Sequence, residues 1–584
     1  MSYYWRIPIS ITLRAPWVTP GDTAAGPGLD AVLARDTSGR RFILSASLIK
    51  GNLLAAAQQL CLEGIVKGKD VEELFGTPSG NRTTGEPAPQ WQVDNEPERA
   101  ALIFPDFQSD EYTQNTDITA FKRTARVQID PELGAVQEGA LQFIECPFEF
   151  GHGVAFRGDL IFVPTNIGNK ASLGAQDAQV LIALAGQRVF AIGGMKSVGF
   201  GRVAAFEVGD ARSFSCRMRP RVPAKPTEPN QRLRIKYSVD RPFIVDAKRH
   251  GQNMHVGSDV LPGGAIKGTL ARAIAASGID ATDFLSQMVI SHAHPNGRRA
   301  LPLSLSVGEN SLFCGLTGKE HVGHHKFQPD WKTEEREVRN ALAGTLGPNW
   351  KDDPRIQYSG RTRTRIVSET LTSAYEPGID GAEGSGQLFS QMAVVPTEDL
   401  LWHGFMSTRS ADGPLSEILT MLDQGVPGFG KTGAVIYGSA EKDEPLKVPK
   451  CDHLHLCLET EACLFSPENA SNTSVQELYR RYFEEHGLHL ERFYAQQHIK
   501  GGYLALRYRA NPNGYIPWVM TSPGSVFRLK VVDGAKLADI LQHGLQPASG
   551  LSDDWRKFPF LRENGFGQVS FDFDHVRVSK GLKL

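Results

Sequence analysis

The chain has 584 residues, of which 41% are hydrophobic and 22% charged, values typical of a globular protein with roughly three to four domains. Its formal net charge of −2 excludes the attraction of nucleic acid by a large overall positive charge, so any nucleic-acid site must gather basic residues locally. The seven cysteines form no CxxC pair, which argues against a disulfide framework and favours a reducing, cytoplasmic setting.

A first unit is expected over residues 1–215, and it opens with a strand. The apolar residues of this first segment alternate as in a half-buried strand, at Ile7, Ile9, Ile11 and Leu13. A helix is predicted to begin at Leu44–Gly51, and its apolar face consists of Ile49, Leu53, Ala56 and Leu60.

The start of this helix suits an anion. Its first turn carries Ser47 and Lys50, and exposed amide groups, the helix dipole and the ammonium group all attract phosphate there. The alternative is a simple helix cap. The pattern repeats at Leu261–Gly268, which carries Lys267 and is followed by Arg272. The apolar face of this second helix is Ile266, Leu270 and Ile274.

A basic strand and a glycine-rich loop follow in the first unit. Segment 121–130 carries Arg123 and Arg126, and a later loop carries Lys196 and leads into a strand at Val203. Glycine lets a backbone pass close to a phosphodiester, and the loop positions concerned are Gly193, Gly194, Gly199 and Gly201. A solvated strand face and an ordinary turn are the alternatives.

Prolines and basic residues interrupt regular structure at 216–231, which predicts a semi-rigid linker. Strands restart after it and again at Cys451, so we expect a second unit over 232–450, with its C-terminal part over 451–584. Polar stretches rich in glycine and proline are expected to be exposed insertions, at 76–98 and 376–385.

The second unit has its own basic strand within residues 358–367. A strand would present its alternate arginines on one face, as a row that follows a phosphate backbone, and these are Arg361, Arg363 and Arg365. A solvated strand face is again the alternative. Segment 562–571 repeats the glycine-then-strand pattern, with Gly565 and Gly567 as candidate RNA contacts.

Segment Gly425–Thr432 fits the P-loop pattern GxxxxGK[ST], but its context is wrong for a nucleotide site. A helix is predicted before it and a strand after it, the reverse of a P-loop. We interpret it as another RNA-facing glycine loop that includes Lys431. The alternating Cys451, His453, His455 and Cys457 indicate a half-buried strand rather than a zinc site, so no metal ligands are assigned.

Asp36 lies in a polar loop ahead of the first lysine turn. A carboxylate beside bound RNA deprotonates a 2′-hydroxyl or helps to hold a divalent ion that does so. The alternative is a solvated loop residue.

Together these features resemble the RAMP superfamily of CRISPR–Cas systems, specifically backbone subunits of type III effector complexes. Asp36 followed by Leu44–Gly51, then Leu102–Asp106, Arg126–Asp130 and the loop 193–201, fall in the family's order. In the second half, Leu261–Gly268 keeps the turn. Further segments are similar to the larger subunit of type III-D systems, namely Ser291–Pro295, Pro523–Phe527 and Glu563–Gly567.

The resemblance implies an α+β fold of tandem ferredoxin-like (RRM-like) domains with hairpin and loop insertions. It implies binding of a CRISPR RNA guide and a target RNA, together with other RAMP and large-subunit proteins, and no membrane. It further implies cleavage of the target beside Asp36 with a divalent metal ion, Mg²⁺, that is not stably bound. Asp246 and Asp259, which precede the second turn, are the further catalytic candidates, although neither has the spacing of Asp36.

Two alternatives stay open. One is a non-catalytic structural guide-RNA binder whose complex cuts elsewhere. The other is a CRISPR RNA-processing endoribonuclease, in which His250 or His255 would be the base.

Overall fold

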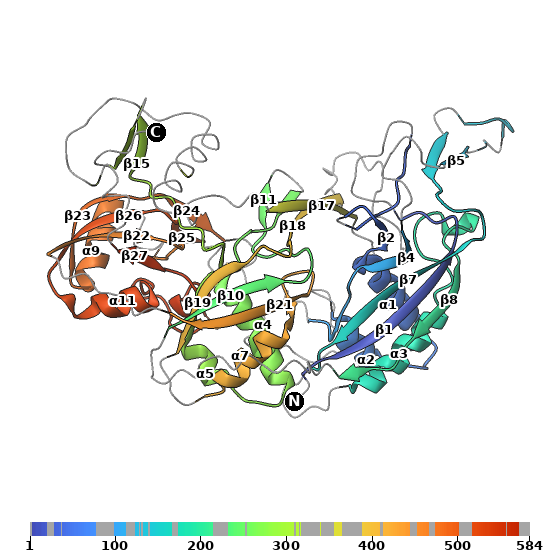
Figure 1. The fold of residues 1–584 in the computed structure, drawn as a ribbon, viewed down its shortest axis with the longest axis horizontal. Helices are drawn as coiled ribbons and strands as arrows, with labels where there is room; N and C mark the ends of the chain where they lie inside the picture. Colours follow the sequence, from blue (N-terminus) through green and yellow to red (C-terminus); the bar gives the residue numbers. More distant parts are fainter. Residues whose placement is uncertain are drawn as a thin grey trace.

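The computed structural model describes residues 3–19, 29–36, 38–77, 99–112, 123–127, 129, 132–137, 141–165, 173–213, 232–250, 254–308, 311–314, 316, 339, 356–364, 388–408, 413–443, 452–466, 473–501, 517–555 and 557–571. These residues form a mixed α/β structure with mostly antiparallel sheets (Figure 1). None of its helices is long and apolar enough to cross a membrane. The linker expected at 216–231, the insertion at 376–385 and most of that at 76–98 lie outside the described residues, as do Arg365 and Cys451.

The first unit contains a 7-stranded sheet whose main path has the order β2-β4-β7-β1-β8. Its strands are β1 (Trp5–Arg14), β2 (Arg41–Leu44), β3 (Leu102–Ile103), β4 (Phe107–Tyr112), β7 (Gly153–Phe162), β8 (Val203–Val208) and β9 (Arg212–Ser213). A hairpin of β5 (Arg123–Arg126) and β6 (Gln142–Glu145) lies outside this sheet. The helices are α1 (Ala46–Leu62), α2 (Gly68–Phe75), α3 (Ala175–Gln187) and the short η2 (Lys196–Val198).

The apolar periodicity predicted both the central strand and the first helix correctly. The alternating apolar side chains of β1 are buried, as are the four on the predicted face of α1. They pack into one core with α2 and α3. Burial of such a face, rather than helix propensity, is what stabilises a helix of this length.

The second unit is built on a 6-stranded sheet with the main order β13-β19-β10-β21-β20. Its strands are β10 (Leu233–Val239), β13 (Met288–Ile290), β14 (His294–Pro295), β19 (Trp402–Thr408), β20 (Val426–Phe429) and β21 (Ala434–Lys442). Its helices are α4 (Gly263–Ala276), α5 (Thr282–Gln287) and α7 (Leu415–Gln424). The restart of a strand after residue 231 and the buried face of α4 are confirmed.

A separate 4-stranded sheet of this unit has the order β11-β12-β18-β17. It contains β11 (Lys248–His250), β12 (Met254–Val256), β18 (Leu388–Val395) and β17 (Gln357–Thr364), so the expected basic strand is a strand. A further hairpin pairs β15 (Leu305–Gly308) with β16 (Ser311–Cys314).

The C-terminal part has its own core and a 4-stranded sheet of order β23-β26-β22-β27. The sheet contains β22 (His453–Leu458), β23 (Leu488–Tyr494), β26 (Val526–Val531) and β27 (Val569–Phe571), which confirms the strands predicted near both ends of this part. Beside it lie β24 (Gln497–Lys500), β25 (Trp518–Thr521), α9 (Val475–Glu485), α11 (Leu537–His543), η5 (Gly534–Lys536) and η6 (Arg562–Asn564).

The first two units share a core, which the sequence did not indicate. Tyr3, Tyr4 and Ile103 belong to the buried cluster of the second unit rather than the first. The Tyr3 hydroxyl donates a hydrogen bond to the Gly425 carbonyl, 2.6 Å away. The start of the chain therefore helps to fix the second unit against the first.

Candidate nucleic-acid interface

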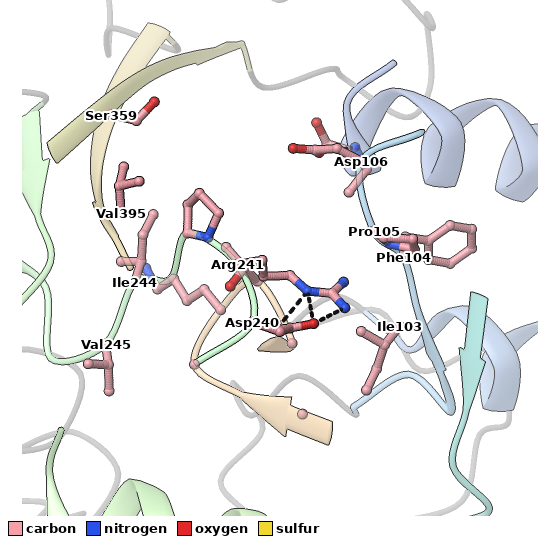
Figure 2. Close-up of a pocket in the computed structure, with 18 of the residues that line it drawn as sticks. Ile103, Phe104, Pro105, Asp106, Asp240, Arg241, Ile244, Val245, Ser359 and Val395 are labelled. Atoms are coloured by element: carbon pink, nitrogen blue, oxygen red, sulfur yellow. Dashed lines mark hydrogen bonds and ion pairs between the residues drawn. The ribbon is translucent and has the colours of Figure 1, made fainter. Parts of the chain in front are cut away.

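A cavity of about 1350 Å³ lies between the first and second units. Figure 2 shows the strand segment from Ile103 to Asp106 on one side and the second unit's Ile244, Val245 and Val395 on the other. The cavity brings together six of the residues predicted from the sequence, which are Asp36, Ser47, Lys50, Asp246, Arg272 and Lys431.

Asp36 is held in a side-chain-capped turn at the cavity wall. Its Oδ1 accepts hydrogen bonds from the backbone amide of Arg40 at 2.9 Å and from the Ser38 hydroxyl at 2.9 Å. Its Oδ2 accepts from the same hydroxyl at 3.0 Å. Because each carboxylate oxygen has about two lone-pair directions, Oδ2 keeps acceptor capacity beyond this one donor. The side chain is thus oriented by the turn and still able to accept a further proton or donor.

The start of α1 differs from the prediction of exposed amides. Asp106 caps it, because its Oδ1 accepts from the Ala46 amide at 2.8 Å. A carboxylate at this position already satisfies the helix dipole, so the dipole does not call for a bound phosphate. Lys50 is the group at this helix start that could still bind an anion, because its ammonium makes no hydrogen bond or ion pair with the described residues. Burial lowers the pKa of this ammonium. Ser47 is exposed beside it.

The P-loop-like segment Gly425–Thr432 consists of β20 and most of the tight turn that leads into β21. As predicted, α7 precedes it and a strand follows it, so it lacks P-loop topology. The Lys431 amide donates to the Ile244 carbonyl at 2.9 Å, which fixes the turn against the cavity wall. The Lys431 side chain is exposed, whereas the Thr432 hydroxyl oxygen is buried without a partner among the described residues.

Arg272 of α4 reaches across to the first unit. Its Nη2 donates to the Ala100 carbonyl at 2.7 Å, and its buried Nε has no partner in the described part of the chain. Burial, and then the charge of nearby Arg99, lower its pKa to about 10. An unsatisfied buried donor of this kind costs roughly 1–3 kcal/mol, so an anion at this point would be stabilising.

Sequence reasoning missed the pair of Asp240 and Arg241, which projects into the middle of the cavity in Figure 2. Arg241 donates from Nε and Nη2 to Oδ2 of Asp240 at 2.9 and 2.6 Å. Asp240 also accepts from the Val435 amide at 2.7 Å. The Arg241 Nη1 is buried without a partner among described residues. An arginine directly after an aspartate gives no sequence signal for such a role.

Asp246 lies on the cavity rim facing the C-terminal part. Its φ of 42° is a left-handed conformation, which aspartate tolerates better than most residues. Its carboxylate is 3.6 Å from Nζ of Lys500. Lys500 also pairs with Glu461, so Asp246 is engaged by the neighbouring part of the chain.

The charges in the cavity are unevenly satisfied. The carboxylates that line it among the described residues all contact protein donors, and they are Asp36, Asp106, Asp240 and Asp246. In contrast, Lys50 and Lys431 make no ion pair with described residues, and Arg272 leaves a donor free. The surplus of unsatisfied positive donors suits an anionic ligand.

Several predicted residues lie elsewhere. Asp259 does not line the cavity and forms an ion pair with Arg298 at 2.9 Å. The second lysine turn is also covered, contrary to the prediction of exposed amides. The Gly263 amide donates to Nδ1 of His292 at 3.2 Å, and Gly263 and Gly264 lie against Asn564 of η6.

Lys267 therefore faces the C-terminal part rather than the cavity. Burial lowers its pKa to about 7, although the charge of Glu563 opposes this shift. Gly565 and Gly567 have positive φ and pack against His292 and Leu545, so chain packing accounts for both glycines.

The glycine-rich loop of the first unit forms a second basic group. Arg126 donates from Nη1 to the Met195 sulfur at 2.6 Å, and its guanidinium carbon lies 5.6 Å from the Phe200 ring centroid. Lys196 donates to Oδ1 of Asn52 on α1 at 2.6 Å, and burial lowers its pKa. The hairpin, the loop and α1 are thereby joined.

The other predicted residues of the hairpin and the glycine-rich loop contact an aromatic ring or allow close packing of the backbone. Arg123 lies over the Phe143 ring at 5.0 Å. Gly193 and Gly201 leave no room for a side chain against Val18 and Ile192, and the Gly194 amide donates to the Val18 carbonyl at 2.7 Å. Gly199 has open space beside it, so it is the loop glycine that a ligand backbone could approach.

The predicted arginine row starts at the cavity. Residues Gln357, Tyr358, Ser359 and Gly360 of β17 line it, and Arg361 and Arg363 follow at alternate positions of the same strand. The strand thus leads from the cavity toward the predicted phosphate contacts.

The described residues that line the cavity do not form a group of ligands for a metal ion. Among the described residues, no group of three or more His, Cys, Asp or Glu side chains could hold one. The residues around Asp36 therefore do not fit a resident, protein-held ion.

Residues 10–204 match the family described as the RAMP superfamily, so the first unit contains a RAMP superfamily domain, as its motifs predicted. The curated proteins gave no match. Among solved structures, a chain of the Type III-B Cmr-beta complex bound to cognate target RNA and AMPPnP is similar at 14% identity and a TM-score of 0.28, covering 50% of this chain and 86% of that one.

Two further structures show comparable similarity. A chain of a Type IV-B CRISPR complex has 13% identity and a TM-score of 0.25, covering 37% of this chain and 95% of that one. A chain of Type III-B Cmr-beta bound to cognate target RNA has 12% identity and a TM-score of 0.23, covering 36% and 98%.

Proposed function

We propose that the chain is a CRISPR RNA-binding backbone subunit of a type III effector complex, of the III-D kind, with two fused RAMP units of tandem ferredoxin-like design. The observation that carries this proposal is the cavity beside the RAMP domain, in which Lys50, Lys431 and Arg272 hold unsatisfied positive donors. Its partners are a guide RNA, a target RNA and other RAMP and large-subunit proteins.

The local charges suit an RNA backbone better than a small anion alone. Arg361 and Arg363 follow in β17 directly after the residues that line the cavity, while Lys196 lies in the glycine loop of the RAMP domain and Arg126 contacts that loop. A row of cations spaced along strands and loops follows successive phosphates. Sequence specificity then comes from base pairing with the guide, so a near-neutral protein suffices.

The second part of the proposal is cleavage of the guide-paired target RNA beside Asp36. Oδ2 of Asp36 has spare acceptor capacity at the cavity wall, so it can accept the proton of a 2′-hydroxyl as that oxygen attacks the adjacent phosphorus. The bond from phosphorus to the 5′-oxygen of the next nucleotide then breaks, and that oxygen leaves with a proton from water, which gives a 2′,3′-cyclic phosphate and a 5′-hydroxyl. Lys50 in the same cavity would stabilise the charge that builds on the phosphate oxygens. Because the described residues do not fit a resident metal ion, any Mg²⁺ would act only while RNA is bound.

One observation favours a second candidate, a structural guide-RNA binder without catalysis. The hydrogen bonds of Asp36 are those of an aspartate that caps its own turn, a role complete without chemistry. A processing nuclease has less support, because His250 and His255 do not line the cavity.

The decisive experiment is purification of the full chain with its complex, followed by extraction and sequencing of bound RNA. The proposal expects guide-length RNA that is lost at high salt. Target cleavage by the wild type and by Asp36→Asn then separates the catalytic candidate from the structural one. Purification free of RNA, with no RNA uptake on titration, would overturn the proposal.

A further inference from the structure

One corner of the cavity is built jointly by the two units. Ala100 and Ile103 of the first unit line one side of this corner. Arg272 of α4 and the turn between β20 and β21 line the other side. A side-chain carbon at Gly433 would meet Ile103, and one at Gly428 would lie 3.5 Å from Nη1 of Arg272. The absence of a side chain at Gly433 lets the turn approach Ile103, whereas Gly428 of β20 lies at ordinary contact distance from Arg272.

Two polar groups in this corner are unsatisfied for independent reasons. Nη2 of Arg272 is used by the Ala100 carbonyl, which leaves the buried Nε without an acceptor among the described residues. The Thr432 hydroxyl oxygen is buried at the end of the turn and has no partner there either. The exposed Lys431 precedes it directly.

No carboxylate in the described structure neutralises this corner. Asp240, the acidic group from the neighbouring segment, is occupied by Arg241 and the Val435 amide. The nearby charge is Arg99, which has the same sign as Arg272 and lowers its pKa further after burial has done so. Arg272 Nε, the Thr432 hydroxyl and the Lys431 ammonium group are donors that line the same cavity and suit an oxyanion.

We propose that Arg272, Lys431 and Thr432 form a subsite for a single phosphate group at the junction of the two units. A phosphate offers several acceptor oxygens and matches both the guanidinium edge and the hydroxyl. Because Arg272 is at the same time bonded to Ala100, a bound phosphate would strengthen the contact between the units. The subsite deepens the proposed function if the phosphate belongs to RNA, and in that respect it rests on that function.

The phosphate has three possible sources, which are inorganic phosphate, the terminal phosphate of a nucleotide or RNA, and an internal phosphodiester. They share the same chemistry at the subsite. We would titrate the full chain with sodium phosphate against sodium chloride of equal ionic strength, with ATP, and with a short RNA carrying either a 5′-phosphate or a 5′-hydroxyl. Calorimetry measures affinity, and the thermal unfolding midpoint measures stabilisation.

The variants are Arg272→Gln and Thr432→Val, with Arg480→Gln as the control, because Arg480 is a surface arginine of α9 that pairs with Glu477. Arg272→Gln removes charge and the unit-to-unit bond together. Thr432→Val keeps the shape and the Ala100 bond and removes only the hydroxyl, so it tests the subsite even if the first variant folds poorly. We expect each to weaken phosphate or RNA binding about tenfold, the factor that corresponds to one charge-assisted hydrogen bond, and the control to leave binding unchanged.

The results with the different probes distinguish the three sources of the phosphate, and they also separate failure of the subsite from failure of the proposed function. Equal affinity for both short RNAs, reduced by both variants, assigns the subsite to an internal phosphodiester, whereas preference for the 5′-phosphate or for ATP assigns it to a terminal one. Phosphate binding that depends on Thr432 without any RNA binding would leave the subsite standing and the proposed function overturned. Unchanged binding of every probe by both variants, while Lys50→Gln weakens RNA binding, would overturn the subsite alone.

Discussion

Arg272 of α4 donates a hydrogen bond across 2.7 Å to the backbone carbonyl of Ala100 and so joins the second unit to the RAMP domain of the first. A side chain that binds a backbone carbonyl with one nitrogen and leaves another buried without an acceptor is incompletely satisfied. Lys50 and Lys431 of the same cavity make no ion pair with described residues, whereas the described carboxylates of the cavity contact protein donors. This asymmetry underlies the predictions about RNA.

Replacing Lys50 with Gln should weaken RNA binding and reduce the slope of log affinity against log salt by just under one unit, as expected for one lost phosphate contact. The matched control is Lys267→Gln, because Lys267 faces Glu563 instead of the cavity. Filter binding over a salt series measures both quantities. Equal losses in the two variants would contradict the assignment of the cavity as the RNA site.

Asp36→Asn should abolish one target cut while guide and target binding persist. Asparagine keeps a carbonyl oxygen for the Arg40 amide, so the turn survives with a loss of about 1 kcal/mol or less in the free energy of unfolding. Asp36→Ala loses both roles. Asp259→Asn is the control outside the cavity, since it touches Arg298 instead.

Fragment mapping on a gel reads the cuts for all three variants. If Asp36→Asn and Asp36→Ala cleave at every wild-type position, the chain is a scaffold and Asp36 only caps its turn. Asp246→Ala adds a second arm and should remove another cut only if the second unit is catalytic. Its contact with Lys500 predicts instead a loss of stability.

Chelation of divalent ions should leave the thermal unfolding midpoint unchanged, and a loss of target cleavage on chelation would show that an ion acts only while RNA is bound. The reason is that the described residues contain no group of three side chains able to hold a metal ion. Calorimetric scans with and without a chelator, beside cleavage assays, measure the two effects. A drop in the unfolding midpoint on chelation would reveal a structural ion.

Lys431→Ala should not change the dependence of any activity on ATP, because the turn joins two strands, β20 and β21, and does not lead from a strand into a helix. A phosphate-release assay on the wild-type chain should show no ATP turnover. Turnover that disappears in the variant would reinstate the P-loop interpretation of Gly425–Thr432.

Acid should destabilise the C-terminal part through Glu461, whose carboxylate pairs with His498 and Lys500 of the same part. Burial opposes ionisation there, but hydrogen bonds from His498 and the charge of Lys500 prevail and lower its pKa from 4.5 to about 2. A carboxyl with a lowered folded-state pKa contributes stability above pH 4.5, and this contribution disappears as the pH falls toward 2.

The difference in unfolding free energy between wild type and Glu461→Gln isolates this contribution. It should shrink by up to about 3 kcal/mol between neutral pH and pH 2, since one pKa unit corresponds to about 1.4 kcal/mol. Chemical denaturation at a series of pH values measures it. A difference that does not vary with pH would rule out the ion pair as a source of stability.

Periodicity predicted the elements that bury one face. Ile9 and Leu53 are typical, because alternation and helical spacing leave only one way to place apolar side chains inside. The candidate site was predicted in part. Asp36, Lys50 and Lys431 came from motifs, yet nothing in their spacing indicated that they share one cavity, because that depends on how two units pack.

The errors have the same origin. Both lysine turns suggested open helix starts, but Asp106 and His292 satisfy them from distant parts of the chain. The sequence did not predict that Arg241 lines the cavity and pairs with Asp240, because this role depends on three-dimensional geometry and not on a sequence pattern. Local sequence reports propensity and periodicity, whereas long-range capping and pairing arise only in the folded chain.

The hydrogen bond from Tyr3 to Gly425 spans 422 positions. During synthesis the tyrosine leaves the ribosome long before its acceptor has been made. Tyr3 and Tyr4, which are buried in the core of the second unit in the folded chain, therefore remain exposed to water or to a chaperone until that unit has been synthesised. Pausing of translation before residue 425 would prolong this exposed stage.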